Sequence, residues 1–252
     1  MAGTVDVELT SDGVAVVRLD DPERRNALTN DLVEAMVRTF DELEASGDTR
    51  AVVVTGAGGA FCAGADLSQL GESRETGLRH IYEGFLRVAR SPLLSVAAVN
   101  GPAVGAGMNL ALACDVIVAG ASARFDTRFL ALGIGPGGGH TWWLQRRVGP
   151  QGAAAMVLCG ETLDGAAAER SGLAWRSVDD DELLPTARAL AAGAAAAPPE
   201  LLARTKRTLA ATAGGTHADA LETELETQLW SMDEPAFAER LAALQARITR
   251  RA

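Results

Sequence analysis

Apolar and polar positions change their spacing along the first half of the chain. Two short runs rich in valine flank the turn sequence SDG, a pattern that predicts a β-hairpin. Residues 28–46 then repeat apolar side chains every three or four positions behind Thr29, a residue type that favours a helix N-cap. The hairpin strands are expected in VDVELT and VAVVRLD, and the apolar helix face at Leu32, Met36, Phe40 and Leu43.

Unbroken apolar runs replace this spacing in the middle of the chain. AVVVTG and LLSVAAVNG are typical of strands buried on both faces, as in a parallel sheet. The second run leads into GPAVGAGMNLALACD, a bare turn followed by an apolar helical stretch that carries the polar Asn109. Further elements are a polar helix near residues 74–90, strands at VIVAG and ARF, and a helix after GIGPGGGHTWW. The chain therefore predicts an α/β body.

From Pro198 onward the pattern predicts helices alone. The alanine run ALAAGAAAAPP precedes them and is expected to form the hinge between the body and this helical tail. We therefore expect two regions, residues 1–197 and residues 198–252. Within the body, Asp164 is expected to cap a short helix, and Asp115 to make structural hydrogen bonds.

Composition narrows the class of protein. The 252 residues are 48% hydrophobic and carry a formal net charge of −10. This charge argues against nucleic-acid or anionic-membrane binding, which needs a basic face. No stretch approaches the roughly 18 apolar residues of a membrane span. The N-terminal stretch lacks the basic and apolar regions of a secretory signal, so we expect a cytoplasmic protein.

The metal-binding residue types are few and scattered. Cys62, Cys114 and Cys159 form no CxxC pair, and His80, His140 and His217 form no HExxH pair. We therefore expect neither a metal site nor a disulfide framework.

Glycine-rich loops are the strongest candidates for chemistry. GIGPGG matches GxGxxG, but it lies in mid-chain and contains a proline, which argues against dinucleotide binding. AFCAGADL and GPAVGAGMNL each follow a buried strand, and their small side chains would let backbone N–H groups approach a ligand. Two such donors, one at a helix start, would form an oxyanion hole. The same residues are also compatible with two tightly packed turns.

Together these segments resemble the crotonase superfamily, the enoyl-CoA hydratase/isomerase family. The resemblance rests on PERRNAL, AFCAGADL, AVNGPAVGAGMNLALACD, RFDTRFLALGIGPGGG and ETLDGAAAERSGLAWRSV, in this order along nearly the whole chain. It implies a spiral of ββα turns followed by helices that build a homotrimer or a dimer of trimers. It also implies an acyl-CoA or enoyl-CoA thioester as ligand, with coenzyme A as part of the substrate and no separate cofactor.

The resemblance also assigns residues to the site. It places the two oxyanion-hole N–H groups at Ala63 and Ala106. Two glutamates that handle water in family hydratases fall at Asn109 and Phe129, so both carboxylates are missing. An aspartate used by certain family isomerases and dehalogenases would fall at Gly137. The coenzyme A and substrate contacts are assigned to Arg25, Ala27, Leu28, Ala63, Ala65, Asp66, Leu67, Ala106 and Gly137.

A replacement acid or base has to come from another residue. Asn109 can hold a water or a carbonyl group but accepts no proton at neutral pH. His140 is expected at a helix start, where the positive end of the helix dipole would keep its imidazole neutral and available as a base. It could equally be a structural residue, and Asp126 could orient it or cap a strand.

We therefore expect an acyl-CoA-binding enzyme that stabilises a thioester enolate in an oxyanion hole and adds water poorly. A non-catalytic acyl-CoA-binding protein on the same fold is the first alternative. A CoA-thioester hydrolase or decarboxylase is the second, and turnover and product analysis would separate the three.

Overall fold

The structure is a computed structural model that describes residues 3–66, 68 and 74–249. The chain divides into two compact units, Met1–Ala194 and Ala195–Ala252. The boundary expected from the sequence, between residues 197 and 198, falls in the same alanine-proline stretch. One expected site residue, Leu67, lies outside the described residues.

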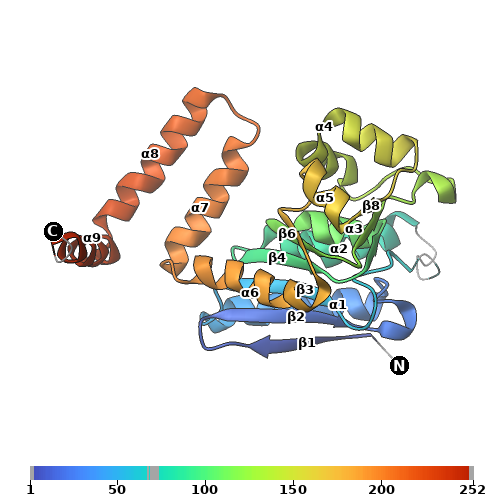
Figure 1. Ribbon diagram of the computed structural model, residues 1–252, viewed down its shortest axis with the longest axis horizontal. Coiled ribbons are helices and arrows are strands. Elements are labelled where there is room, and N and C mark those ends of the chain that lie inside the picture. Colours follow the sequence, from blue (N-terminus) through green and yellow to red (C-terminus); the bar gives the residue numbers. More distant parts are fainter. Residues whose placement is uncertain (1–2, 67, 69–73, 250–252) are drawn as a thin grey trace. The chain divides into compact units, whose positions relative to one another are not determined.

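The first unit is built on a sheet whose described strands follow the order β1-β2-β3-β4-β6-β9. Figure 1 labels β1, β2, β3, β4 and β6 of this sheet. β1 pairs with β2 in antiparallel fashion around a turn in which Gly13 has a φ of 81°, which confirms the predicted hairpin. The remaining neighbours are parallel, and β3 is buried along its whole length, as its apolar sequence predicts. The strands are β1 (Thr4–Leu9), β2 (Val14–Asp20), β3 (Ala51–Gly56), β4 (Leu94–Val99), β6 (Val116–Gly120) and β9 (Arg176–Val178).

Helices cover this sheet and bury the core. The predicted cap is confirmed, because Thr29 Oγ1 accepts a hydrogen bond from Leu32 N–H at 3.2 Å. Asp164 likewise accepts from Ala167 N–H at 2.7 Å, and Asp115 bonds to the backbone and hydroxyl of Ser95. The helices are α1 (Asn30–Ser46), α2 (Arg74–Arg90), α3 (Ala106–Ala113), α4 (His140–Leu158), α5 (Gly165–Ser171) and α6 (Asp180–Ala195), with 3-10 turns η1 (Pro22–Arg24) and η3 (Leu130–Leu132).

A smaller sheet positions the start of α3. It has the order β5-β7-β8, formed by β5 (Pro102–Val104), β7 (Arg124–Asp126) and β8 (Leu163–Asp164). The sequence predicted a bare turn where β5 lies. The strand forms because its partner β7 is supplied from about twenty residues further along the chain, which local pattern alone does not reveal.

The second unit contains α7 (Pro199–Thr212), α8 (His217–Asp233) and α9 (Pro235–Thr249), which confirms the helical prediction. The alanine run does not form the predicted hinge over its full length. Its residues up to Ala195 belong to α6, because alanine is the strongest helix former, and the helix ends before the proline pair.

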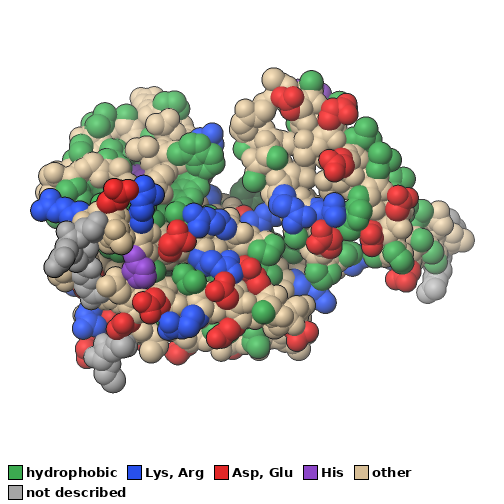
Figure 2. Space-filling model, turned by 180° about the vertical axis from the view of Figure 1, so that it is seen from behind, with side chains coloured by type: hydrophobic (Ala, Val, Ile, Leu, Met, Phe, Trp, Pro, Cys, Tyr) green, Lys and Arg blue, Asp and Glu red, His purple; other side chains and the backbone are tan. Residues whose placement is uncertain are grey.

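Large apolar side chains lie exposed on the second unit. Figure 2 shows apolar side chains along the surface of these helices. They lie at helical spacing, and α8 and α9 have no buried residue among those described. They are Leu221, Leu225, Leu229 and Met232 on α8, and Phe237, Leu241, Leu244 and Ile248 on α9. None of the described helices has the length and hydropathy of a membrane span.

Candidate functional site

The helix α3 begins at a glycine turn whose backbone N–H groups are not all used within the protein. Gly105 precedes it with φ 52° and ψ −113°, and its N–H donates to the carbonyl oxygen of Asp126 at 2.9 Å. The next N–H, that of Ala106, has no acceptor within the helix because it belongs to the first turn. No described residue elsewhere accepts it either. The positive end of the helix therefore presents an unused donor.

A second loop, residues 60–66 after β3, lies directly against this helix. Gly107 shows the contact, because a Cβ atom added there would lie 2.0 Å from the carbonyl oxygen of Cys62. The loop is also bonded to β5, since Cys62 N–H donates to Pro102 O at 3.1 Å and Val104 N–H donates to Cys62 O at 3.0 Å. Loop and helix therefore meet backbone to backbone.

The other edge of this loop pairs with Leu28. Leu28 N–H donates to Gly64 O at 2.7 Å, and Asp66 N–H donates to Leu28 O at 3.1 Å. In such a parallel bridge the residue between the two bonded neighbours directs its own N–H to the opposite side. That residue is Ala65, and no described residue accepts its N–H. Its donor therefore points away from Leu28, toward the side on which β5 leads into α3.

This bonding corrects the expected assignment of Ala63. The N–H of Ala63 donates to the carbonyl oxygen of Arg25 at 3.0 Å, so it is used within the protein and is not available to a thioester. Of the loop residues that the sequence singled out, Ala65 has the unused donor. The sequence missed this role because only the pairing with Leu28 determines which amide of the loop faces outward.

Asn109 lies one turn into α3 and is 1% exposed. Its Nδ2 donates to the carbonyl oxygen of Gly137 at 3.0 Å. Its Oδ1 lies 2.7 Å from Nδ1 of His140. The amide therefore joins α3 to the glycine loop before α4 and to the first residue of α4.

His140 is buried, with 1% of its surface exposed. Its ring packs edge to face against Phe129, with the two ring centroids 4.9 Å apart. Burial lowers the pKa of His140 to about 4, so the imidazole is neutral at pH 7. The neutral state expected from the sequence is thus present, but desolvation causes it. Its Nε2 is buried and has no hydrogen-bond partner among the described residues.

Phe129 connects the two parts of the site. A Cβ atom added at Gly105 would lie 3.9 Å from the Phe129 ring, so this ring lies beside the turn that precedes Ala106 as well as beside His140. Asp126, which the sequence analysis considered as a residue that could orient His140, accepts a hydrogen bond from Arg128 Nε at 2.9 Å. The residue that holds the His140 ring is therefore Asn109.

The two expected coenzyme A segments lie side by side. Arg25 and Leu28 are joined to the loop containing Ala65 by the backbone bonds described above. Arg25 is exposed and has a φ of 52°, Ala27 is half-buried, and Leu28 is fully buried.

The glycine loop before α4 contacts a residue that the sequence analysis did not single out. A Cβ atom at Gly137 would lie 2.3 Å from the Tyr82 hydroxyl oxygen on α2. Tyr82 therefore borders the segment that bonds to Asn109. Nothing in the helical pattern of α2 distinguishes this tyrosine, because its neighbour belongs to a loop more than fifty residues later.

The described residues contain no group of three or more histidine, cysteine or acidic side chains that could hold a metal ion. Burial raises the pKa of the Cys62 thiol to about 12, which leaves it protonated and unreactive. The site is thus made of backbone amides, one amide side chain and one imidazole.

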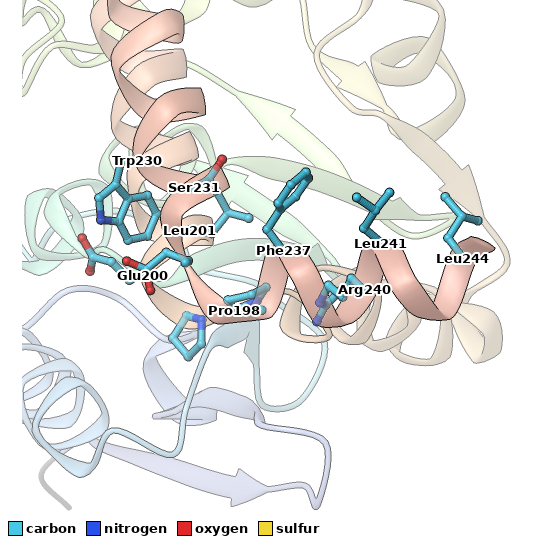
Figure 3. A pocket seen from close by; sticks show the side chains of 12 residues that line it. Pro198, Glu200, Leu201, Trp230, Ser231, Phe237, Arg240, Leu241 and Leu244 are labelled. Carbon is cyan, nitrogen blue, oxygen red and sulfur yellow. The ribbon is translucent and has the colours of Figure 1, made fainter. Parts of the chain in front are cut away.

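A separate groove lies within the helical unit. Its volume is about 480 Å³, and Phe237, Leu241 and Leu244 project into it from one side of α9, as Figure 3 shows. Trp230 of α8 and Leu201 of α7 complete its apolar wall. None of its lining residues belongs to the candidate site described above.

Residues 9–243 match the family model for enoyl-CoA hydratase/isomerase. The protein belongs to this family, and its fold is the crotonase fold. The predicted fold class, a crotonase-like α/β fold, is confirmed.

Individual relatives agree with this assignment. "Probable enoyl-CoA hydratase EchA14" of Mycobacterium tuberculosis is 48% identical over 244 residues, covering 93% of this chain and 94% of its own. An enoyl-CoA hydratase from Polaromonas sp. JS666 superposes with a TM-score of 0.90 at 27% identity, over 97% of this chain and 98% of that one. A Thermobifida fusca YX protein described as "a putative enoyl-CoA hydratase" was solved in complex with acetoacetyl-CoA. Its TM-score is 0.82 at 31% identity, covering 92% of this chain and 95% of that one.

Proposed function

We propose that this protein binds an acyl-CoA thioester and stabilises its enolate with the backbone N–H groups of Ala65 and Ala106. The observation that carries the proposal is the pair of unused amide donors on two segments in backbone contact. Preorganised N–H donors of this kind stabilise negative charge on a thioester oxygen at little reorganisation cost. The complex of the Thermobifida fusca relative with acetoacetyl-CoA supports the ligand class.

Water addition by this site is slow. Asn109 is bonded to Gly137 and His140, and an amide accepts no proton at neutral pH. Phe129 has no polar atom in its side chain. Acid-base groups typically contribute about 10²–10⁴-fold each, so a site without either carboxylate is a poor hydratase.

Binding is tested first, by calorimetry with butyryl-CoA. We expect a measurable dissociation constant for the wild type and a large loss for Ala106→Leu, because the added side chain stands at the donor. His217→Gln on α8 is the control that leaves the loops untouched. Absence of binding by the wild type at millimolar ligand would exclude the acyl-CoA function.

Hydration is tested with crotonyl-CoA, whose conjugated absorbance falls as water adds. We expect kcat well below the roughly 1–10³ s⁻¹ of ordinary enzymes. Asn109→Glu combined with Phe129→Glu should raise the rate, whereas either change alone should do little because the two groups act as a unit. A wild-type kcat in the ordinary range would show that the missing carboxylates are not needed.

The helical region completes the proposal. α8 and α9 expose a row of apolar side chains that no described residue of their own unit covers, and burial of such a surface is favourable. We propose that this region joins copies of the chain into a homotrimer or a dimer of trimers. Light scattering gives the mass; a wild type that stays monomeric at micromolar concentration would refute this part alone.

A further inference from the structure

The Asn109–His140 contact determines which ring nitrogen of His140 holds the proton. Asn109 Nδ2 donates to Gly137 O, and this bond fixes the orientation of the amide, leaving Oδ1 toward the imidazole. An amide oxygen only accepts, so His140 Nδ1 must carry the hydrogen. The neutral ring has one hydrogen on nitrogen, and Nε2 is therefore left with a lone pair.

That lone pair has no partner within the described residues. Nε2 is buried, while nearly all buried polar atoms in folded proteins are hydrogen-bonded. A metal ion does not account for it, because the described residues form no metal-binding cluster around it. A buried acceptor without a protein partner is a place where a ligand atom can bind.

The position of the ring connects this acceptor to the oxyanion-hole amides. Phe129 packs against the His140 ring on one side and approaches Gly105 on another. Gly105 directly precedes Ala106, whose N–H is an unused donor. Phe129 therefore neighbours both the imidazole and the turn that carries the donor.

We propose that His140 is the base of this site, that Asn109 is the positioning residue that keeps Nε2 unprotonated, and that the pair moves a proton between C2 and C4 of an enoyl-CoA. This inference rests on the acyl-CoA function proposed above. The reaction shifts a double bond from C3=C4 to C2=C3 and consumes no water.

The step balances without a further reactant. Nε2 takes the proton from C2, and the C2–H electron pair becomes part of a dienolate whose oxygen is held by Ala65 and Ala106. The imidazolium then returns the proton from Nε2 to C4. The C4–H bond forms, the C2=C3 double bond remains, and His140 is neutral again.

The surroundings of His140 suit a base that becomes charged only briefly. Asn109 and Phe129, which contact its ring, carry no charge, and burial lowers the pKa of His140 to about 4. Formation of an enolate anion beside the ring offsets the cost of a buried imidazolium, because opposite charges stabilise each other strongly in a poorly solvated site.

The charged groups on the neighbouring segments are engaged elsewhere. Asp126 and Arg128 pair with each other. Arg147 of α4 donates to the carbonyl oxygen of Cys114 at the far end of α3. The Tyr82 hydroxyl, which lies beside Gly137, is a further titratable group at this segment.

The test uses trans-3-hexenoyl-CoA in D2O. Isomerisation is followed by the rise of conjugated absorbance, and mass spectrometry measures deuterium in the product. We expect the wild type to isomerise the probe and incorporate deuterium. His140→Gln should lower both rates about 10²–10⁴-fold while binding butyryl-CoA within threefold of the wild type. His217→Gln is the matched control, because His217 is also the first residue of a helix but is exposed.

Asn109 is tested separately through the pH dependence of the rate. Asn109→Asp keeps an acceptor for Nδ1–H and adds a negative charge, so the acidic limb of the pH profile should move to higher pH. Asn109→Leu removes the acceptor and should lower kcat about 10–100-fold with little change in KM. An unmoved profile in Asn109→Asp would show that Asn109 does not act through His140.

Each result decides between the two proposals. A wild type that binds butyryl-CoA but neither isomerises the probe nor exchanges deuterium overturns the inference and leaves the binding function intact. A wild type that does not bind overturns both. If His140→Gln does not fold, Asn109→Asp and Asn109→Leu still give the pH and rate readouts, and wild-type rates in both overturn the inference.

Discussion

The two sides of the candidate site use different groups of the chain: one side uses backbone amides and the other uses side chains. One side consists of backbone N–H groups, those of Ala65 and Ala106, aimed by strand pairing and by a helix start. The other side consists of side chains, Asn109 and His140, joined by a single hydrogen bond. The first side depends on the fold, and the second depends on which residues occupy a few positions.

This difference has a consequence for the evolution of function on the fold. A backbone donor is retained as long as the segments pack closely, whatever the outer side chains become. A side-chain acid or base, by contrast, is lost with a single substitution. The family fold can therefore keep its means of polarising a thioester while the proton-transfer groups change.

The largest expected effect comes from separating the two amide-bearing segments. Gly107→Ala places a Cβ atom 2.0 Å from the carbonyl oxygen of Cys62, an overlap that backbone must move to relieve. We expect a loss of about 3 kcal/mol or more in unfolding free energy and a large loss of butyryl-CoA affinity. Urea denaturation and calorimetry measure the two quantities.

Gly193→Ala is the matched control. Gly193 lies inside α6, and a Cβ atom there has no neighbour within 4 Å. The same substitution should therefore be neutral or stabilising by up to about 1 kcal/mol. Equal losses in the two variants would mean that the close contact at Gly107 does not hold the amides in place.

Local pattern predicted the elements that supply the amides. The hairpin, the buried strand β3, the caps of α1 and α5 and the helices of the second unit are all confirmed by the structure. These elements follow from hydrophobic spacing and capping residues, which act over a few positions along the chain.

What could not be predicted depends on pairing between distant segments. The choice of Ala65 rather than Ala63 as donor depends on Leu28, which pairs with this loop from more than thirty residues earlier. The bond from Asn109 to His140 spans 31 positions. Residue type indicated that both side chains were candidates, but not that they touch.

A smaller effect is expected on the side-chain side, in the pH dependence of stability. Burial lowers the pKa of His140 from an ordinary 6.5 to about 4. The unfolded chain therefore binds this proton at a higher pH than the folded chain does. The contribution of the neutral His140 to the free energy of unfolding is therefore complete above pH 6.5 and is lost as the pH falls toward 4.

At pH 5 this loss amounts to about 2 kcal/mol relative to pH 7.5. Urea denaturation of the wild type and of His140→Gln at both pH values isolates it, since all other titrating groups are shared. The wild type should lose about 2 kcal/mol more than the variant, and His217→Gln should behave as the wild type does. Parallel pH dependence of wild type and His140→Gln would show that the imidazole is not held neutral by burial.

The smallest effect is expected at Arg25, whose backbone bonds to the loop that contains Ala65. Its carbonyl oxygen accepts the Ala63 N–H, and its exposed side chain stands where the family resemblance places a coenzyme A contact. Arg25→Asn preserves the positive φ, which asparagine tolerates, and removes only the guanidinium. We expect affinity for butyryl-CoA to fall about three- to tenfold, as for one exposed charge contact to phosphate.

The loss should shrink at high salt, and affinity for butyryl-pantetheine, which lacks the nucleotide phosphates, should not change. Calorimetry at low and high salt with both ligands measures this, with Arg38→Asn on α1 as the control. An equal loss for the two ligands would mean that the substitution disturbs the loop and its amides instead of a phosphate contact.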